Sequence, residues 1–124
     1  MDWSQFKNFS QNEFACTFTG QCEMNESFLK KLQSLRELYG KPMRITSGFR
    51  HTTHPIEAKK IKAGVHTLGH AADVACSGRE AFQLITLALK VGMTGLGVSQ
   101  RRGQPRFIHL DDIAKNPRPN IWSY

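Results

Sequence analysis

The sequence predicts an α+β fold, in which two main helices pack on a small antiparallel or mixed sheet. Apolar residues recur at helical spacing in 25–40 and 77–92, whereas four shorter apolar segments have the length of strands. At 124 residues the chain is long enough for one hydrophobic core, so we expect a single domain over 1–124. We expect residues 1–13 to form an entry segment and 113–124 an irregular tail.

The first long helix is predicted over 25–40, with Asn25 as its N-cap and Gly40 as its end. Its apolar stripe consists of Phe28, Leu32, Leu35 and Tyr39. Such a stripe is typical of a helix that packs on a core. The next segment, MRITSGF at 43–49, predicts a buried strand that leaves into a turn.

The second half of the chain alternates strands with one helix. Residues 50–65 have no sustained period, and a loop of that length in a small domain is usually functional or disordered. The small apolar run at 71–76 predicts the second strand. A helix over 77–92 follows, with Ser77 and Glu80 as a capping box. The third and fourth strands are TGLGVSQ and RFIHLD, and the turn RRGQP between them predicts a hairpin.

The net charge of +7 favours an anionic partner such as nucleic acid, a membrane surface or the acidic polymers of a bacterial wall. The basic residues occur in short groups without the interleaved aromatic residues of RNA-binding segments, so we expect no nucleic-acid partner. No apolar run approaches the length of a membrane span, so we expect no membrane insertion. We expect a monomer.

Cysteine usage and the first residues bear on the compartment. Cys16, Cys22 and Cys76 are an odd number at irregular spacing, which argues against a disulfide scaffold and fits reduced, structural thiols. The segment MDWSQFKNFSQNEF has neither the basic nor the apolar region of a secretory signal. We therefore expect synthesis in the cytoplasm without a signal peptide.

The stretch HTLGHAADVAC at 66–76 places two histidines and an aspartate where a buried strand begins. An unpaired charge there is costly, so the stretch is a metal site, a hydrogen-bonded cluster or a surface loop. His66 would lie on the loop that enters the strand, Asp73 on the strand, and His109 on the fourth strand. Two imidazoles and one carboxylate around an open position would make a catalytic zinc site at the sheet. A satisfied structural histidine is the alternative for each histidine alone.

His70 has the i, i+4 interval to His66 that zinc-binding helices use. No glutamate follows His66, however, and Gly69 interrupts a helix. We therefore expect His70 to support or pack against the site and not to bind the metal.

These residues resemble the zinc D-alanyl-D-alanine carboxypeptidases and L-alanyl-D-glutamate endopeptidases, in their small phage and bacterial branch. The motifs ITSGFR, HTLGHAAD, GLGV and RFIHLD occur in that family's order, and a tryptophan follows them, so that the resemblance covers about residues 14–124. It implies one zinc per chain held by His66, Asp73 and His109, and hydrolysis of peptide bonds in peptidoglycan stem peptides. It also implies that Arg50 reaches the substrate's carboxylate or scissile carbonyl, and a guanidinium suits either group.

The chain departs from the family's pattern at three positions. Many relatives carry a serine two positions before the first histidine ligand, where this chain has Gly64. The well-studied enzymes place an acidic general base three positions before the last histidine ligand, where this chain has Arg106. The first histidine of the His-x-His found in some relatives is Phe107 here. The sequence therefore does not supply the usual base.

Strand geometry offers a replacement. Alternate side chains of a strand share a face, so Asp111 points the same way as His109 and is our candidate for the general base. Its alternative role is to orient a neighbour of the metal, as supporting carboxylates do. Asp112 lies on the opposite face. His51 and His54, in the long loop, are candidates for substrate contact or proton transfer.

Two functions follow for a protein with these residues. The first is a zinc metallopeptidase that cuts cell-wall peptides in phage lysis or wall remodelling. The alternative is a peptidoglycan-binding module of a phage particle with weak or no turnover. The missing base favours the module, whereas Arg50 and the complete ligand set favour the enzyme. In either case we expect action at the bacterial cell wall, after release from the cell or as part of a virion.

Overall fold

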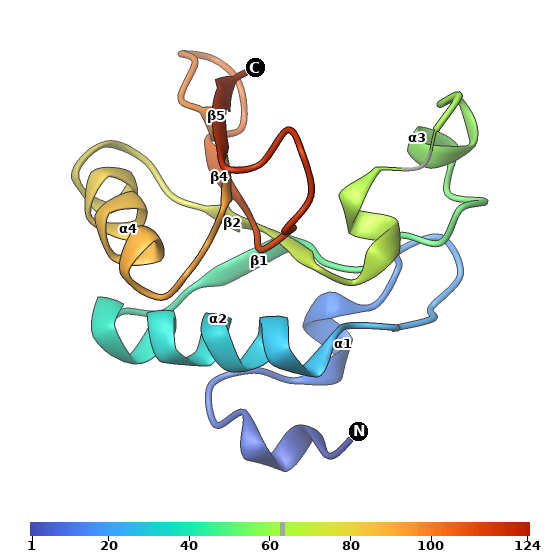
Figure 1. Ribbon diagram of the computed structural model, residues 1–124, viewed down its shortest axis with the longest axis horizontal. Helices are drawn as coiled ribbons and strands as arrows, with labels where there is room; N and C mark the ends of the chain where they lie inside the picture. Colours follow the sequence, from blue (N-terminus) through green and yellow to red (C-terminus); the bar gives the residue numbers. More distant parts are fainter. Residues whose placement is uncertain (63) are drawn as a thin grey trace.

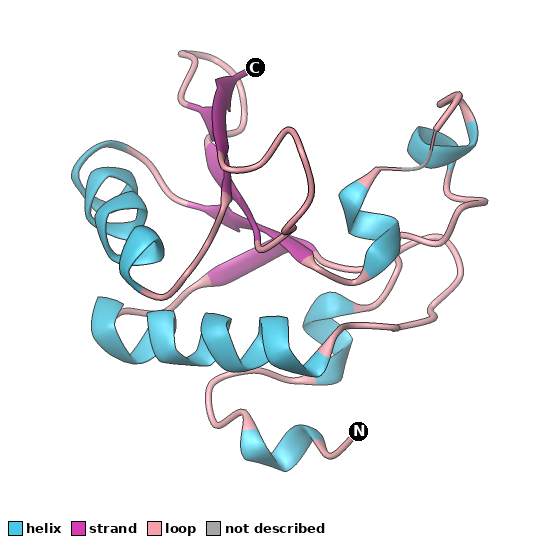
Figure 2. Ribbon diagram, in the orientation of Figure 1, coloured by secondary structure: helices cyan, strands magenta, loops and turns pink. Residues whose placement is uncertain are grey.

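The computed structural model describes residues 1–62 and 64–124 and confirms the α+β fold, with strands at the centre and helices around them (Figure 1, Figure 2). The predicted loop at 50–65 includes position 63, which lies outside the described residues. The elements in chain order are η1 (Trp3–Gln5), α1 (Gln11–Phe14), α2 (Glu26–Tyr39), β1 (Arg44–Ser47), α3 (Pro55–Ala58), η2 (Val65–Leu68), β2 (Ala71–Ala75), α4 (Gly78–Lys90), β3 (Gly95–Ser99), β4 (Phe107–Asp111) and β5 (Asn120–Ser123).

The five strands form one mixed sheet in the order β1-β2-β4-β3-β5. The pairs β1–β2, β2–β4 and β3–β4 are antiparallel, whereas β5 runs parallel to β3. The hairpin predicted for the third and fourth strands is therefore confirmed. Asp73 of β2 and Gly97 of β3 both lie opposite His109 of β4. This register brings residues that are far apart in the sequence to one place on the sheet.

One face of the sheet packs apolar side chains against the helices, and the other, here called the polar face, carries the polar side chains of the site together with aromatic ones. Because side chains alternate along a strand, Val74, Ile108 and Leu110 face the helices. They join a buried core with α2 and α4, which lie on the same side of the strands (Figure 1). Asp73 and His109 face the other way. The packing of two main helices on one face is as predicted.

The ends of the two long helices differ in how well the sequence predicts them. The Asn25 side chain accepts a hydrogen bond from the Phe28 amide at 2.9 Å, and Gly40 ends α2 in the left-handed region, both as predicted. The capping box predicted for Ser77 and Glu80 is wrong, because the Ser77 side chain makes no cap hydrogen bond. The Gln100 side chain accepts a hydrogen bond from the first amide of α4 instead, at 3.1 Å.

Two strand predictions need correction. The segment 43–49 contains β1, but β1 is an edge strand with exposed and half-buried residues, not a buried strand. The irregular tail at 113–124 contains β5, which pairs with β3 from Gly95↔Asn120 to Val98↔Ser123. The entry segment at 1–13 also contributes to the hydrophobic core, since Phe6 and Phe9 are buried there.

No helix in the described parts of the chain is long and apolar enough to cross a membrane.

Candidate metal centre

The polar face of the sheet gathers His66 of η2, Asp73 of β2 and His109 of β4, here called the metal group. One ligand atom of each residue lies within 4.8 Å of the other two, and all three residues are buried. Asp73 Oδ1 lies 3.3 Å from His66 Nε2 and 3.0 Å from His109 Nδ1. The structure thus brings together the three residues that the sequence nominated as ligands.

His66 is oriented by a backbone carbonyl. Its Nδ1 lies 2.8 Å from the oxygen of Gly48. A carbonyl oxygen can only accept, so Nδ1 donates and the lone pair of Nε2 faces Asp73. Gly48 is required at its position, because a Cβ there would lie 2.6 Å from the backbone of Phe14. The turn after β1 is therefore held by α1 and in turn fixes the imidazole of His66.

His109 is oriented by a buried ion pair. Its Nε2 lies 2.7 Å from Asp111 Oδ2, on the ring's other side from the nitrogen that faces Asp73. Arg118 donates to both oxygens of Asp111, from Nε at 3.0 Å and from Nη2 at 2.8 Å. Burial alone would raise the pKa of Asp111, but the hydrogen bonds from His109 and Arg118 outweigh it and lower that pKa to about 2. Asp111 is therefore an anion that fixes the His109 ring.

The electrostatics of the metal group suit a divalent cation. Burial would raise the pKa of Asp73, but hydrogen bonds with His109 and His66 hold it well below its usual range. The same burial would lower the pKa of His109, and the carboxylates of Asp111 and Asp73 raise it instead. The group offers two imidazole nitrogens and one anionic oxygen, and each imidazole is oriented by a partner outside the group. That donor set fits zinc with an open position for a substrate.

Arg50 lies beside the metal group and is held by a glutamate that the sequence analysis missed. Its Nη1 lies 3.1 Å from Glu57 Oε2 and its Nη2 lies 3.9 Å from Asp73 Oδ2. The Glu57 side chain is fully buried and also accepts from Lys60 Nζ at 3.1 Å and from the Gly64 amide at 2.9 Å. Glu57 sits on α3, within a segment that has no clear period, so no pattern singled it out.

The loop histidines stay outside the metal group and bond to their own neighbourhood. His51 Nδ1 lies 2.8 Å from Thr53 Oγ1. His54 accepts from the Ile56 amide at 3.1 Å and thereby caps α3, while its Nε2 lies 3.3 Å from Thr17 Oγ1. His54 also lines, with Arg50, a cleft of about 400 Å³ beside β1. His54 thus lines the same cleft as Arg50, whereas His51 does not line it.

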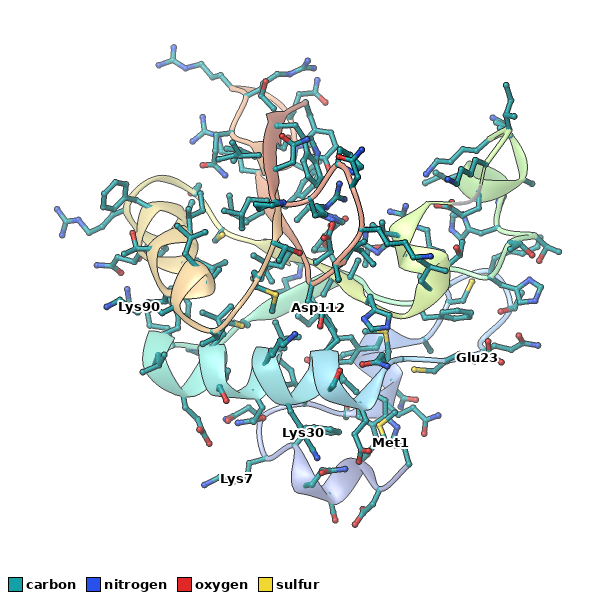
Figure 3. The ribbon with its side chains drawn as sticks, viewed as in Figure 1. Met1, Lys7, Glu23, Lys30, Lys90 and Asp112 are labelled. Atoms are coloured by element: carbon teal, nitrogen blue, oxygen red, sulfur yellow. The ribbon has the colours of Figure 1, made fainter. Side chains whose placement is uncertain are left out.

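Asp112 lies on the side of the sheet that faces α2 (Figure 3), and it forms a separate pair with His70. His70 Nδ1 lies 2.7 Å from Asp112 Oδ1, and Lys31 of α2 binds the other oxygen at 2.9 Å. His70 is therefore absent from the metal group, and Asp112 lies on the face opposite to Asp111, both as expected.

Aromatic side chains from the last strand cover the site. The Trp122 ring lies 5.2 Å from that of His109, and the Arg118 guanidinium lies 4.8 Å from the Trp122 ring. The Tyr124 ring contacts Phe107 at 5.1 Å. Arg118 and Tyr124 were not predicted as site residues. The strand signal in IWSY could have placed Tyr124, whereas Arg118 lies before that segment, in NPRPN.

A family model for Peptidase M15 matches residues 7–111, which is most of the chain and includes the whole metal group. The chain belongs to the Peptidase M15 family. M15 peptidases are zinc-dependent metallopeptidases, so membership indicates a zinc-dependent hydrolase that acts on peptidoglycan-type peptides. The match ends at Asp111, before Arg118 and β5. No curated protein matches the chain.

Proposed function

We propose that this M15 peptidase hydrolyses peptide bonds in peptidoglycan stem peptides or cross-links, during phage lysis or wall remodelling. One observation carries the proposal: His66, Asp73 and His109 converge as a buried donor set, with each imidazole oriented by a partner outside the set. An arginine beside this donor set supports a peptidase, because a guanidinium can bind a substrate carboxylate or a carbonyl oxygen that gains charge. Arg50 lies 3.9 Å from the Asp73 carboxylate.

The proposed roles of the protein groups follow from their positions. Zinc, when bound by the metal group, would supply Lewis-acid chemistry for hydrolysis of the peptide bond. The Arg50 guanidinium would hold the substrate's carboxylate or stabilise charge on the scissile carbonyl oxygen. Glu57 would keep that guanidinium in place, since its own carboxylate is fully buried and fixed by three donors. His54 would contact the substrate from the cleft beside β1.

For Asp111, the contacts favour positioning over the general-base role. Both of its oxygens accept from Arg118, and one also meets His109 on the side away from Asp73. A carboxylate so placed orients a ligand histidine and raises its basicity. We therefore propose Asp111 as the residue that positions His109.

The engagement of Asp111 also supports a second candidate, a binding module of a phage particle that holds the metal and has little turnover. In that case the metal group and Arg50 would dock peptidoglycan peptides without cutting them. The net charge of +7 suits either function, because the bacterial wall is an acidic polymer.

The test combines metal analysis with digestion. We expect close to one zinc per chain after purification, and release of free amino groups from purified peptidoglycan. Mass analysis of the products would name the bond. The His66→Ala protein is the control, because it keeps the surface charge and lacks one donor. A zinc-loaded wild type that binds peptidoglycan without releasing amino groups would establish the binding module instead.

A further inference from the structure

Tyr124 lies on the polar face of the sheet, and the roles proposed for the metal group and Arg50 do not account for it. Its amide donates to the Val98 carbonyl at 3.3 Å, so the β3–β5 pairing continues to this residue. Its ring packs against Phe107, which shares a face with His109 because the two are two apart on β4. The phenol therefore lies over the same face as the metal group.

Gly97 makes the approach possible. A Cβ at this position would lie 2.7 Å from Trp122 Nε1, 2.9 Å from His109 Cβ and 2.9 Å from Tyr124 Cε2. The indole N–H, the edge of the phenol and the base of the ligand histidine thus meet over one residue without a side chain. Any larger residue at 97 would push the two aromatic side chains away from His109.

The phenol also feels the charges of the site. Burial raises the pKa of Tyr124, the nearby indole N–H of Trp122 opposes that rise, and the charges of Asp73, Arg50 and Asp111 all act on the hydroxyl. The hydroxyl therefore remains a donor at neutral pH. The ring edge of Tyr124 lies near the base of His109, because both atoms would contact a Cβ at Gly97.

Arg50 and Tyr124 approach the metal group from opposite edges of the sheet. Arg50 follows β1 at one edge, and Tyr124 follows β5 at the other, with β2, β4 and β3 between them. A carbonyl group presented to His66, Asp73 and His109 would lie between a guanidinium and a phenol. The residue Tyr124 is half exposed, at 52%, so a ligand can reach it.

We infer that the Tyr124 hydroxyl donates a hydrogen bond to the scissile carbonyl oxygen of the substrate, on the side opposite Arg50, and so stabilises the negative charge that develops there. Phe107 has no donor of its own and serves as the support on which the phenol rests. Removing one such donor typically costs a factor of about 10² to 10³ in kcat. The inference rests on the proposed peptidase function, because it needs a substrate whose carbonyl acquires charge.

The test uses the Tyr124→Phe protein, which loses one oxygen atom and keeps the ring that packs on Phe107. With zinc bound, kcat on the cleaved muropeptide should fall about 10²-fold, with a smaller change in KM. Zinc content and melting temperature should equal those of the wild type. Tyr39→Phe is the matched control, since Tyr39 is the chain's other tyrosine and lies at the end of α2 near Lys41.

A binding measurement gives a second readout. A phosphinic acid analogue of the cleaved dipeptide has a tetrahedral phosphorus in place of the scissile carbonyl carbon. Its charged oxygens occupy the position where negative charge develops during hydrolysis. Calorimetry should show that Tyr124→Phe loses affinity for this analogue by a factor close to its loss in kcat, while its affinity for the product peptide is unchanged. Tyr39→Phe should match the wild type in both measurements.

The outcomes separate the inference from the proposed function. If wild type cleaves the muropeptide and Tyr124→Phe equals it in kcat and in analogue affinity, the inference is overturned and the peptidase function stands. Loss of zinc or of thermal stability in Tyr124→Phe would make the hydroxyl a structural group and also overturn it. If zinc-loaded wild type cleaves nothing, both ideas fail together.

Discussion

The metal group and the 50–62 loop of this molecule hold their histidines in different ways. In the metal group, His66 of η2 and His109 of β4 are buried, and each has one nitrogen bound to a partner outside the group, the Gly48 carbonyl and the Asp111 carboxylate. In the loop, His51 and His54 bond to residues of the same loop or to Thr17, and neither is buried. The histidines of the metal group are thus held in a fixed orientation, whereas those of the 50–62 loop bond only to nearby residues of the surface.

The difference shows that a metal-binding histidine can be recognised by the group that holds its second ring nitrogen. A metal-binding imidazole needs its second nitrogen occupied, so that the first presents a lone pair in a fixed direction. His66 and His109 meet this requirement through contacts 18 and 2 residues away in sequence. His70 is bound to Asp112 but faces the helices, so a partner alone does not make a ligand.

The largest expected effect comes from removing a histidine of the metal group. His109→Ala removes one of three donors, so zinc content should fall from near one per chain to near zero, and hydrolysis with it. Elemental analysis after dialysis measures the first and amine release the second. His70→Ala is the matched control and should keep both. Zinc lost in His70→Ala and kept in His109→Ala would show that the ligand assignment is wrong.

The next largest effect is expected at Arg50, which lies at the start of the 50–62 loop and beside the metal group. Arg50→Lys keeps the charge but loses the planar fork, so kcat/KM should fall about 10²-fold. Melting temperature should change little, because Glu57 keeps its bonds to Lys60 and to the Gly64 amide. Zinc content should be unchanged. A parallel loss of activity and stability would instead make Arg50 a structural residue.

The third prediction concerns Asp111, the carboxylate that holds the second ring nitrogen of His109. Asp111→Asn should weaken zinc binding roughly 10- to 100-fold, the usual cost of removing a supporting carboxylate. Competition with a chelator measures the affinity, and kcat at saturating zinc should be near that of the wild type. Asp112→Asn is the control, since its contacts are with Lys31 and His70. Normal zinc affinity together with a 10²-fold lower kcat would restore Asp111 as the general base.

The strand side of the site could be predicted from the sequence, because a period of two fixes which side chains share a face. Asp73 lies on an apolar strand and His109 on another, and antiparallel pairing of β2 with β4 sets them opposite each other. The capping residues of α2 were predictable for a similar reason, since a cap depends on neighbours within three residues.

The rest depends on contacts that no local pattern encodes. No local pattern predicts the strand β5, because two prolines precede it and its partner β3 lies more than twenty residues earlier. Arg118 and Tyr124 were missed along with it. The edge position of β1 and the replacement of the Ser77 cap by Gln100 are likewise set by which elements meet, not by the residues on either side.

The smallest expected effect tests the loop side. His54→Ala removes the cap of α3 and one wall residue of the cleft that Arg50 lines, so KM should rise and kcat should stay within a factor of about ten, less than ~1.4 kcal/mol in the barrier. His51→Ala should be closer still to the wild type, because His51 bonds only to Thr53 through its ring. Steady-state kinetics on one muropeptide, at saturating zinc, resolve the two constants. A loss of kcat in His54→Ala as large as that in Arg50→Lys would mean that a locally tied histidine does chemistry, and the contrast between the two regions would fail as a guide to function.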